Sequence, residues 1–145
     1  MRRSKGFRVL ATGVAVAVVG VLGVSMTAFA TGPTAKATPN TGLVNLKVVV
    51  VTGSGWPYPD TNDIAITECN HNVVTGLTAA DCDTNHIVIT SSRANHTISA
   101  HFTVRTGTIG NATCGTTETD ETCYLGVADI SDFNTVHALA KIVFS

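Results

Sequence analysis

The four cysteines are the residues of this sequence best suited to covalent chemistry: Cys69, Cys82, Cys114 and Cys123. An even number of cysteines in a short exported chain indicates disulfides, and four cysteines allow three connectivities. We expect Cys69 to pair with Cys82 and Cys114 with Cys123, because each pair then closes a short loop. The spacings match no zinc pattern, so we expect no metal site formed by these thiols and His71.

The five histidines could serve as metal ligands or as general acids and bases. They are His71, His86, His96, His101 and His137. No two have the spacing of a metal motif, and His96 and His101 lie five apart on a predicted strand, which places them on opposite faces. No segment resembles the nucleophile elbow of a hydrolase. We therefore expect solvated histidines and a protein that is not an enzyme.

Three acidic residues, Glu118, Asp120 and Glu121, lie close together between Cys114 and Cys123. A calcium site needs about six oxygen ligands at an ordered spacing around a glycine turn. This segment does not provide them, so we expect a solvated loop.

The first thirty residues indicate a secretory signal peptide. Four basic side chains lie within the first eight residues, an uncharged run covers 9–26, and the tripeptide AFA at 28–30 fits the small-x-small cleavage rule. We predict that export removes residues 1–30 and leaves one domain, 31–145. An uncleaved membrane anchor is the alternative interpretation, since a run of this length could span a bilayer. The pair Arg2-Arg3 alone does not distinguish twin-arginine from Sec export.

The charge of the exported domain differs from that of the whole chain. Of nine basic residues four lie within 1–30, whereas all ten acidic residues lie beyond it, so 31–145 carries five basic and ten acidic groups, a net charge near −5. The five cations are scattered: Lys36, Lys47, Arg93, Arg105 and Lys141. Nucleic-acid binding needs a clustered basic surface. We therefore expect no direct contact with nucleic acid.

Short runs of β-branched residues, separated by Gly, Asn, Asp and Thr, predict an all-β domain. Strands are expected at 35–38, 46–52, 63–69, 86–91, 96–105, 123–129 and 138–145. Seven short antiparallel strands in roughly a hundred residues are typical of an immunoglobulin-like sandwich.

Two of these strands, and the segments between them, carry further expectations. In 97–104 apolar and polar residues alternate, which predicts one buried and one wet face. The stretch 46–52 is apolar on both faces, as in a strand at the middle of a sandwich. The polar segments 70–81 and 106–122 fit no strand, and we expect loops there that carry function.

Trp56 lies in the turn sequence GSGWPYPD, directly after the first long strand. Two interpretations stand beside each other. The indole packs against the end of the sandwich, or it projects toward a ligand or partner.

Several short motifs, taken in order, resemble one known family. They are TPNTGL (38–43), VTGSGW (51–56), AITEC (65–69), FTVR (102–105), GVAD (126–129) and the terminal KIVFS (141–145). Together with the two cysteine pairs, they make the chain from Ala37 to Ser145 similar to the neocarzinostatin family, secreted apoproteins that carry enediyne antibiotics.

The resemblance implies a seven-stranded antiparallel sandwich with a small loop lobe, and a ligand cleft between them. It supports the local pairing, with Cys69–Cys82 at the cleft floor and Cys114–Cys123 clipping a loop. It implies no covalent cofactor, and a non-covalently held enediyne-like or other aromatic chromophore. The expected ligand-binding residues are His71, Leu77, Tyr124, Ala128 and Trp56.

The chain departs from the family pattern at the ligand-facing positions. Asn70 and His71 stand where family members can present an aromatic, Tyr124 replaces a polar amide, and Ala128 replaces a serine. The loop 106–114 is short and has no aromatic residue. We therefore expect a more open site than that of the enediyne carriers.

The resemblance implies a bacterial, extracellular, monomeric carrier of a hydrophobic aromatic small molecule, with an antibiotic association and no membrane attachment after signal cleavage. Any DNA damage would come from the ligand. The alternative is an extracellular immunoglobulin-like module that binds protein or cell-wall components through its loops and holds no small ligand.

Overall fold

The computed structural model describes residues 32–57, 63–133 and 135–145. The predicted signal peptide, 1–30, lies outside the described residues. Within the described ranges, no helix has the length and apolar character needed to cross a membrane.

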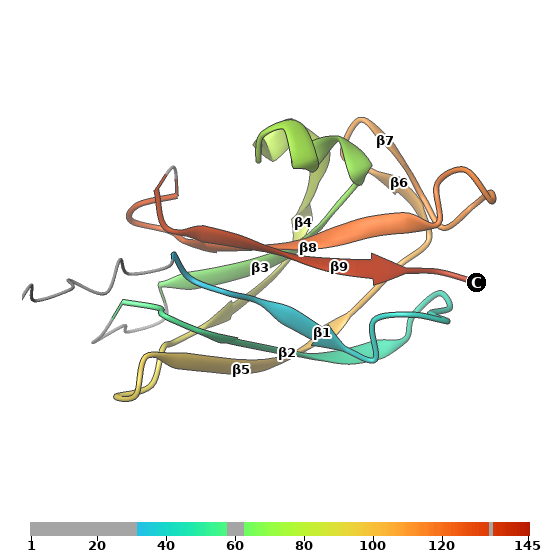
Figure 1. The fold of residues 1–145 in the computed structure, drawn as a ribbon. Helices are drawn as coiled ribbons and strands as arrows, with labels where there is room; N and C mark the ends of the chain where they lie inside the picture. Colours follow the sequence, from blue (N-terminus) through green and yellow to red (C-terminus); the bar gives the residue numbers. More distant parts are fainter. Residues whose placement is uncertain (1–31, 58–62, 134) are drawn as a thin grey trace, which may run out of the picture.

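Two antiparallel sheets lie face to face (Figure 1). The three-stranded sheet has the order β1 (Lys36–Thr38), β2 (Val48–Ser54) and β5 (Thr97–Thr103). The four-stranded sheet has the order β4 (Cys82–Thr90), β3 (Ile64–Cys69), β8 (Thr122–Asp129) and β9 (His137–Val143). These seven strands confirm the predicted antiparallel sandwich.

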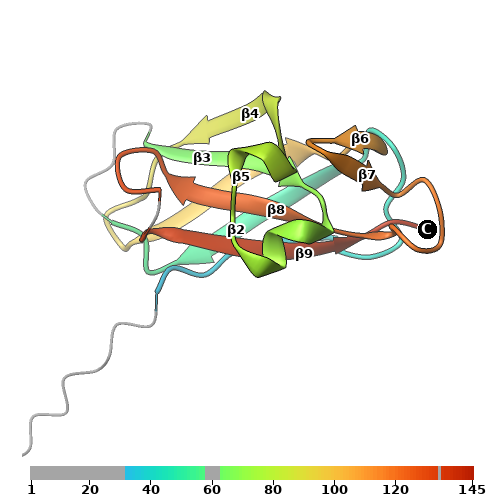
Figure 2. The ribbon, with the colours of Figure 1, turned by 90° about the horizontal axis from the view of Figure 1, so that it is seen from above.

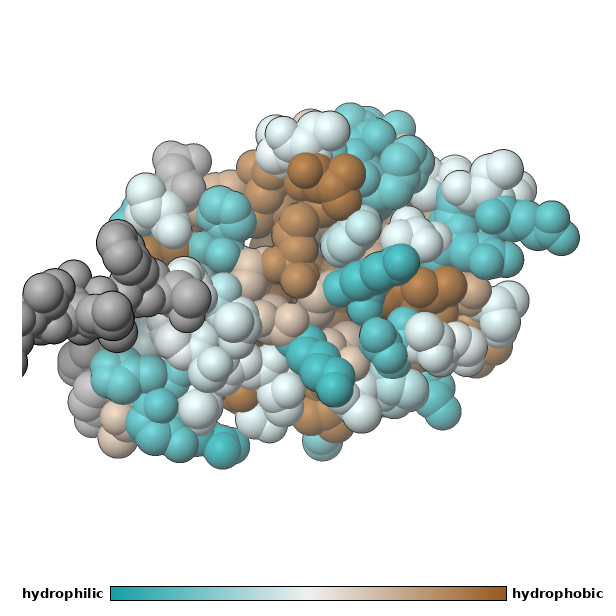
Figure 3. All heavy atoms as spheres, in the orientation of Figure 1, coloured by the Kyte–Doolittle hydropathy of each residue, from teal (hydrophilic) through white to brown (hydrophobic). Residues whose placement is uncertain are grey.

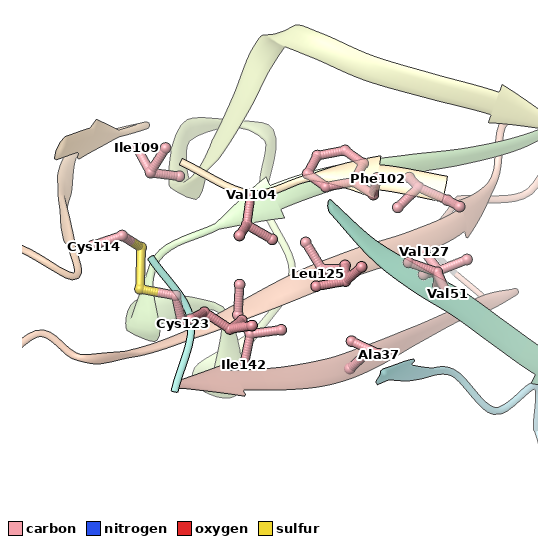
Figure 4. Packing of buried hydrophobic residues seen from close by; sticks show 14 of the residues in the cluster. Ala37, Val51, Phe102, Val104, Ile109, Cys114, Cys123, Leu125, Val127 and Ile142 are labelled. Carbon is pink, nitrogen blue, oxygen red and sulfur yellow. A yellow bond between two sulfur atoms is a disulfide. The ribbon is translucent and has the colours of Figure 1, made fainter. Parts of the chain in front are cut away.

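The core fills the space between the two sheets (Figure 4). In β5, Ile98 and Phe102 are buried whereas Ser99 and His101 are exposed, which confirms the predicted wet face. In β8, Leu125 contributes to the same core. Burial of such side chains is the main source of stability in a domain of this size.

The stretch 46–52 lies at the middle of its sheet, but only one of its faces is buried. Val49 and Val51 are fully buried, whereas Val48 is 51% exposed and Leu46 is 63% exposed. The expectation that both faces are covered was wrong. A sandwich of two layers leaves the outer face of each sheet to solvent.

The loop lobe consists of two short 3-10 turns, η1 (His71–Thr75) and η2 (Ala79–Asp81). Figure 2, together with Figure 1, shows these turns over the outer face of the four-stranded sheet. They fall in the segment 70–81, which was expected to contain no strand.

The segment 106–122 does contain strands, so the prediction of a plain loop was wrong there. A hairpin of β6 (Gly107–Ile109) and β7 (Ala112–Cys114) turns at Gly110 and Asn111. Gly110 has a φ of 59°, which glycine adopts at little cost.

Both predicted disulfides are present, Cys69–Cys82 and Cys114–Cys123. The first joins the end of β3 to the start of β4 and belongs to a small cluster beneath the lobe. The second joins β7 to β8, and both of its cysteines are fully buried in the main core (Figure 4). The second bridge is therefore part of the sandwich core, and not only a clip on a surface loop.

The acidic segment before Cys123 is not the solvated loop that the sequence predicted. Glu118 is exposed, but Asp120 is only 6% exposed. Its carboxylate accepts hydrogen bonds from the Thr113 hydroxyl, from the Thr116 hydroxyl (2.6 Å) and from the backbone N–H groups of Thr116 (2.9 Å) and Thr117 (2.6 Å). These bonds, led by those of the two hydroxyls, hold the pKa of Asp120 well below its usual range.

Candidate ligand-binding cleft

An apolar cleft of about 400 Å3 lies on the outer face of the four-stranded sheet. Side chains alternate along β3, so Ile64 and Ile66 enter the core while Ala65 and Thr67 face the cleft. Gly126 on the neighbouring strand β8 completes this part of the floor. Because these floor residues are small, the sheet leaves a hollow that no side chain of its own fills.

The walls of the cleft are large apolar side chains that remain partly open to solvent. Ile87 and Ile89 from β4 are 45% and 46% exposed, and Ile130, which follows β8, is 54% exposed. Phe133 stands beside them at 37%. Grouped exposure of this kind marks a surface that binds an apolar partner or ligand.

The lining carries almost no polar chemistry. Among the described lining residues only Thr67 and Thr84 carry hydroxyls, and the Thr67 hydroxyl already donates to the backbone carbonyl of Asp83 (2.6 Å). No ionisable side chain is among the described lining residues, since Cys82 is disulfide-bonded. The cleft therefore favours a neutral, apolar occupant.

Leu77, in the connection between η1 and η2, closes the inner end of the cleft. A Cβ atom added at Gly126 would lie 3.2 Å from Leu77 Cδ1 and 3.0 Å from Cys69 Sγ, so Leu77 and the bridge lie directly on the glycine. Behind Leu77, the lobe cluster contains Val73 and Tyr124.

The structure places the predicted ligand-binding residues in different surroundings. Leu77 and Ala128 line the cleft. Tyr124 is half-buried in the lobe cluster, and His71 is exposed on η1; neither lines the cleft. Trp56 is fully buried in the main core, so its indole packs inside the sandwich. Whether any of these residues binds a ligand stays a prediction.

The sequence reasoning missed the main walls of the cleft, Ile87, Ile89, Ile130 and Phe133. The sequence did contain a signal for the first two. Within 86–91, Val88 points inward to the core, and Ile87 and Ile89 lie on the opposite, outer face, so both faces carry apolar side chains. An edge strand with two apolar faces needs a second partner for its outer face. No periodic pattern marks Ile130 or Phe133, since both follow the end of β8.

Two histidines differ from expectation: His86 is half-buried, and His96 is exposed as expected but does not lie on a strand. The half-buried His86 ring lies against Phe102, with ring centroids 5.0 Å apart, and its Nε2 is 3.2 Å from the Thr103 carbonyl oxygen. His96 precedes β5 at a φ of 60°, and its Nδ1 lies 2.9 Å from the Trp56 carbonyl oxygen. The argument from opposite strand faces therefore fails for His96. The described residues contain no group of three or more side chains able to hold a metal ion.

Asn70 fixes the lobe beside the cleft. Its side chain is fully buried, and its Nδ2 donates to the Ile109 carbonyl (2.9 Å) and to Asn111 Oδ1 (2.9 Å). Its Oδ1 accepts from the Asn72 N–H (2.9 Å). One amide thus connects the lobe to the β6–β7 hairpin.

A buried carboxyl group lies on the other side of the cleft floor. Glu68 is 1% exposed; its Oε2 accepts from the Arg105 N–H (2.8 Å), and its Oε1 has no hydrogen-bond partner. The pKa of Glu68 is raised to about 8, chiefly by burial; the Arg105 hydrogen bond opposes this shift, the Asp83 charge adds to it and the Arg105 charge opposes it. Glu68 therefore stays protonated near neutral pH and leaves the floor uncharged.

This architecture is similar to that of known solved structures, although comparisons by sequence find no match. No protein-family model matches the chain, and no curated protein matches it. Solved structures do match: macromomycin has a TM-score of 0.56 and 21% identity, over 79% of this chain and 100% of macromomycin. The solution conformation of apokedarcidin has a TM-score of 0.50 and 18% identity, over 79% of this chain and 99% of that one.

The chain has the neocarzinostatin-like fold. The fold that the sequence motifs predicted is therefore confirmed, and at these identities the likeness concerns architecture. Within the neocarzinostatin-like fold of this chain, the cleft lies between the four-stranded sheet and the loop lobe, where the resemblance had placed a ligand.

Proposed function

We propose that this protein is a non-enzymatic carrier that holds a hydrophobic aromatic small molecule non-covalently in the apolar cleft. The observation that carries the proposal is the cleft itself, about 400 Å3 in volume and walled by partly exposed Ile87, Ile89, Ile130 and Phe133. The likeness to macromomycin and apokedarcidin supports a small-molecule carrier fold.

The chemistry of the lining supports storage of a ligand rather than turnover. A nucleophile or general base must lie within hydrogen-bond reach of the reacting group. The described lining offers two threonine hydroxyls and no ionisable group, and Glu68 faces the core. Such a site removes an apolar molecule from water, and any reactivity belongs to the molecule that it holds.

The proposal includes export to an extracellular, bacterial setting. The two disulfides support it, because disulfides persist in oxidising compartments. If the carried molecule damages DNA, the protein delivers it without contacting DNA itself, since 31–145 has an excess of acidic residues.

Binding is expected to be weak. At roughly 25 cal/mol per Å2, covering about 200 Å2 of apolar surface contributes about 5 kcal/mol before the costs of association. The partly exposed walls leave one side of a ligand in water, which limits the area that can be covered. We therefore expect dissociation constants no lower than about 0.2 mM for small naphthalene probes, and weaker binding of bulky enediyne chromophores.

The test has two parts. Protein purified from its native host should show an absorption band beyond those of Trp and Tyr, and the recombinant domain should bind naphthylethanol saturably in a fluorescence titration. Ala128→Leu, which fills the cleft, should weaken that binding at least tenfold. Ser99→Leu, on the exposed face of β5, is the matched control and should leave it unchanged. Unsaturable binding, or equal effects of both variants, would contradict the proposal.

A further inference from the structure

The four-stranded sheet ends on one side at β4 and on the other at β9 (Figure 2). An edge strand has an outer row of backbone N–H and C=O groups that can pair with a strand of another chain. Natural proteins protect their edges with short strands, proline, charged side chains or covering segments. The edge strands of this sandwich differ in how many of these protections they have.

The edges at β1 and β9 are well protected. β1 has three residues, includes the exposed Lys36 and is followed directly by Pro39. β9 contains the exposed Lys141, and the Val143 N–H at its end donates to the Asn40 carbonyl (2.8 Å), so a loop covers that end. Figure 3 looks onto this side of the molecule, where hydrophilic side chains stand out over β1 and β9.

The edge at β5 is covered in part by a side chain from β4. The His86 ring lies against Phe102, and its Nε2 is 3.2 Å from the Thr103 carbonyl oxygen. This contact leaves β4 as the edge strand with the longest uncovered stretch among the described residues.

The second half of β4 has none of these protections. Residues 86–90 (HIVIT) contain no proline and no Lys, Arg, Asp or Glu, and no described strand pairs with their outer side. The irregular pairing of β4 with β3 falls before Ile87. The even-numbered side chains are half-buried, and Ile87 and Ile89 are 45% and 46% exposed on the outer face. An uncharged, β-branched, exposed edge of this kind favours the addition of another strand.

The charges that flank this segment match those of a second copy. Asp83 lies five residues before Val88, Arg93 lies five residues after it, and no other Asp, Glu, Lys or Arg lies in 83–93. In an antiparallel pair of identical strands centred on Val88, Asp83 of each copy therefore comes opposite the partner's Arg93, which is exposed in the turn after β4. A parallel pair would instead place like charges opposite each other, which is unfavourable.

The same register keeps both faces of the sheet continuous. Ile87 comes opposite the partner's Ile89 on the outer face, and Val88 comes opposite the partner's Val88 on the inner face. A shift by one residue would place exposed isoleucines opposite half-buried positions. Because Ile87 and Ile89 form a wall of the cleft, the partner's two isoleucines extend that wall on its open side.

We propose that two copies of this chain associate through β4, in an antiparallel register centred on Val88, and so join their four-stranded sheets into one continuous sheet. The resemblance to the family implies a monomer, and this association goes beyond it. The association does not depend on what the cleft holds.

The dimer is expected to be weak. Stable interfaces bury about 1,200–2,000 Å2, and one pair of short strands covers less than that. Each copy of 31–145 also carries ten acidic and five basic groups, a net charge near −5 that opposes association. We therefore expect a dissociation constant of roughly 0.1–1 mM.

Sedimentation velocity of the recombinant domain between about 0.02 and 2 mM measures this association. The mean mass should rise from that of one chain toward twice that value. Ile89→Lys places a charge on the edge strand and should weaken the association at least tenfold. Val48→Lys is the matched control, because Val48 is 51% exposed on β2, a central strand with no free edge, and it should leave the association unchanged.

A charge swap tests the register. Arg93→Asp places two carboxylates opposite each other at both ends of the paired segment and should weaken the association about three- to fivefold. Combining it with Asp83→Arg restores opposite charges across the pair and the net charge of the wild type. The double variant should therefore associate as the wild type does.

Each outcome supports or overturns the inference. A domain that stays monomeric at about 2 mM, or an association that Ile89→Lys weakens no more than Val48→Lys, would overturn it. A double variant as weak as Arg93→Asp alone would overturn the antiparallel register. If Asp83→Arg does not fold, amide hydrogen exchange of the wild type decides: protection that grows with concentration at 86–90 supports the pairing, and growth only elsewhere refutes it.

Discussion

Glu68 is a single residue that links the pH of the surroundings to the stability of the cleft floor. In the folded protein its pKa lies near 8, above its ordinary value of 4.5, because burial disfavours the charged carboxylate. Between these two values the folded protein keeps a proton that the unfolded chain releases. The free energy of unfolding therefore falls as the pH rises from about 4.5 to about 8, and below 4.5 this residue contributes no pH dependence.

Glu68→Gln should remove this dependence, because glutamine keeps the carbonyl oxygen that accepts from the Arg105 N–H and carries no charge. We expect the variant to be more stable than the wild type by about 1–3 kcal/mol at pH 8 and by less at pH 5. Urea unfolding at both values measures the difference. Glu121→Gln is the control, and a Glu68→Gln effect that is the same at both pH values would refute the buried-acid argument.

The pKa of Asp120 is shifted in the opposite direction to that of Glu68, so its effect on stability has the opposite dependence on pH. Its folded pKa lies below its ordinary value, so its stabilising effect is present above pH 4 and is lost as the pH falls through the acid range. Asp120→Asn should expose the backbone N–H groups of Thr116 and Thr117 to faster hydrogen exchange at pH 6, while the amides of β5 keep their protection. Unchanged exchange at both threonines would show that the carboxylate does not hold this loop.

At the scale of elements, the β6–β7 hairpin and η2 depend on each other at Gly110. A Cβ atom added there would lie 2.6 Å from the Asp81 carbonyl carbon and 2.8 Å from the Cys82 N, and Gly110 also has a positive φ. Gly110→Ala should therefore lower the free energy of unfolding by at least about 2 kcal/mol, since backbone strain and the backbone clash both contribute.

Gly42→Ala is a matched control for this prediction. Gly42 has a φ of 62°, close to that of Gly110, but nothing lies within 4 Å of an added Cβ. Gly42→Ala should lower the free energy of unfolding by about 1 kcal/mol, because only the backbone strain contributes. Equal losses in chemical denaturation would mean that the contact between the hairpin and η2 contributes nothing.

The same elements show what the sequence could and could not predict. The strands of the sandwich were predictable because their β-branched runs alternate with the pleat, as in β5. The hairpin was not, because three-residue strands are too short for a period, and contacts such as those of Asn70 hold them in place. The cleft walls were missed at Ile130 and Phe133 because the chain turn that places them has no repeating pattern.

At the scale of the whole molecule, the two disulfides lie in different parts of the protein, one in the sandwich core and one at the loop lobe. They close loops of similar length, with sequence separations of 13 and 9, so the chain-entropy model assigns each about 3 kcal/mol. Their surroundings differ: Cys114–Cys123 lies in the main core between the sheets, and Cys69–Cys82 lies in the separate lobe cluster beside the cleft.

These different locations predict different losses of stability and of ligand binding when each disulfide is removed. Replacing Cys69 and Cys82 by alanine should loosen the lobe and abolish binding of naphthylethanol, while the sandwich still unfolds cooperatively in urea. Replacing Cys114 and Cys123 should cost more, because a core contact is lost together with the loop closure, by roughly 2 kcal/mol beyond the first pair. Denaturation, near-ultraviolet circular dichroism and probe titration on both double variants measure stability, packing and binding separately. If the Cys69/Cys82 variant bound the probe as the wild type does, the lobe would not be a wall of the site, and the cleft would belong to the sheet alone.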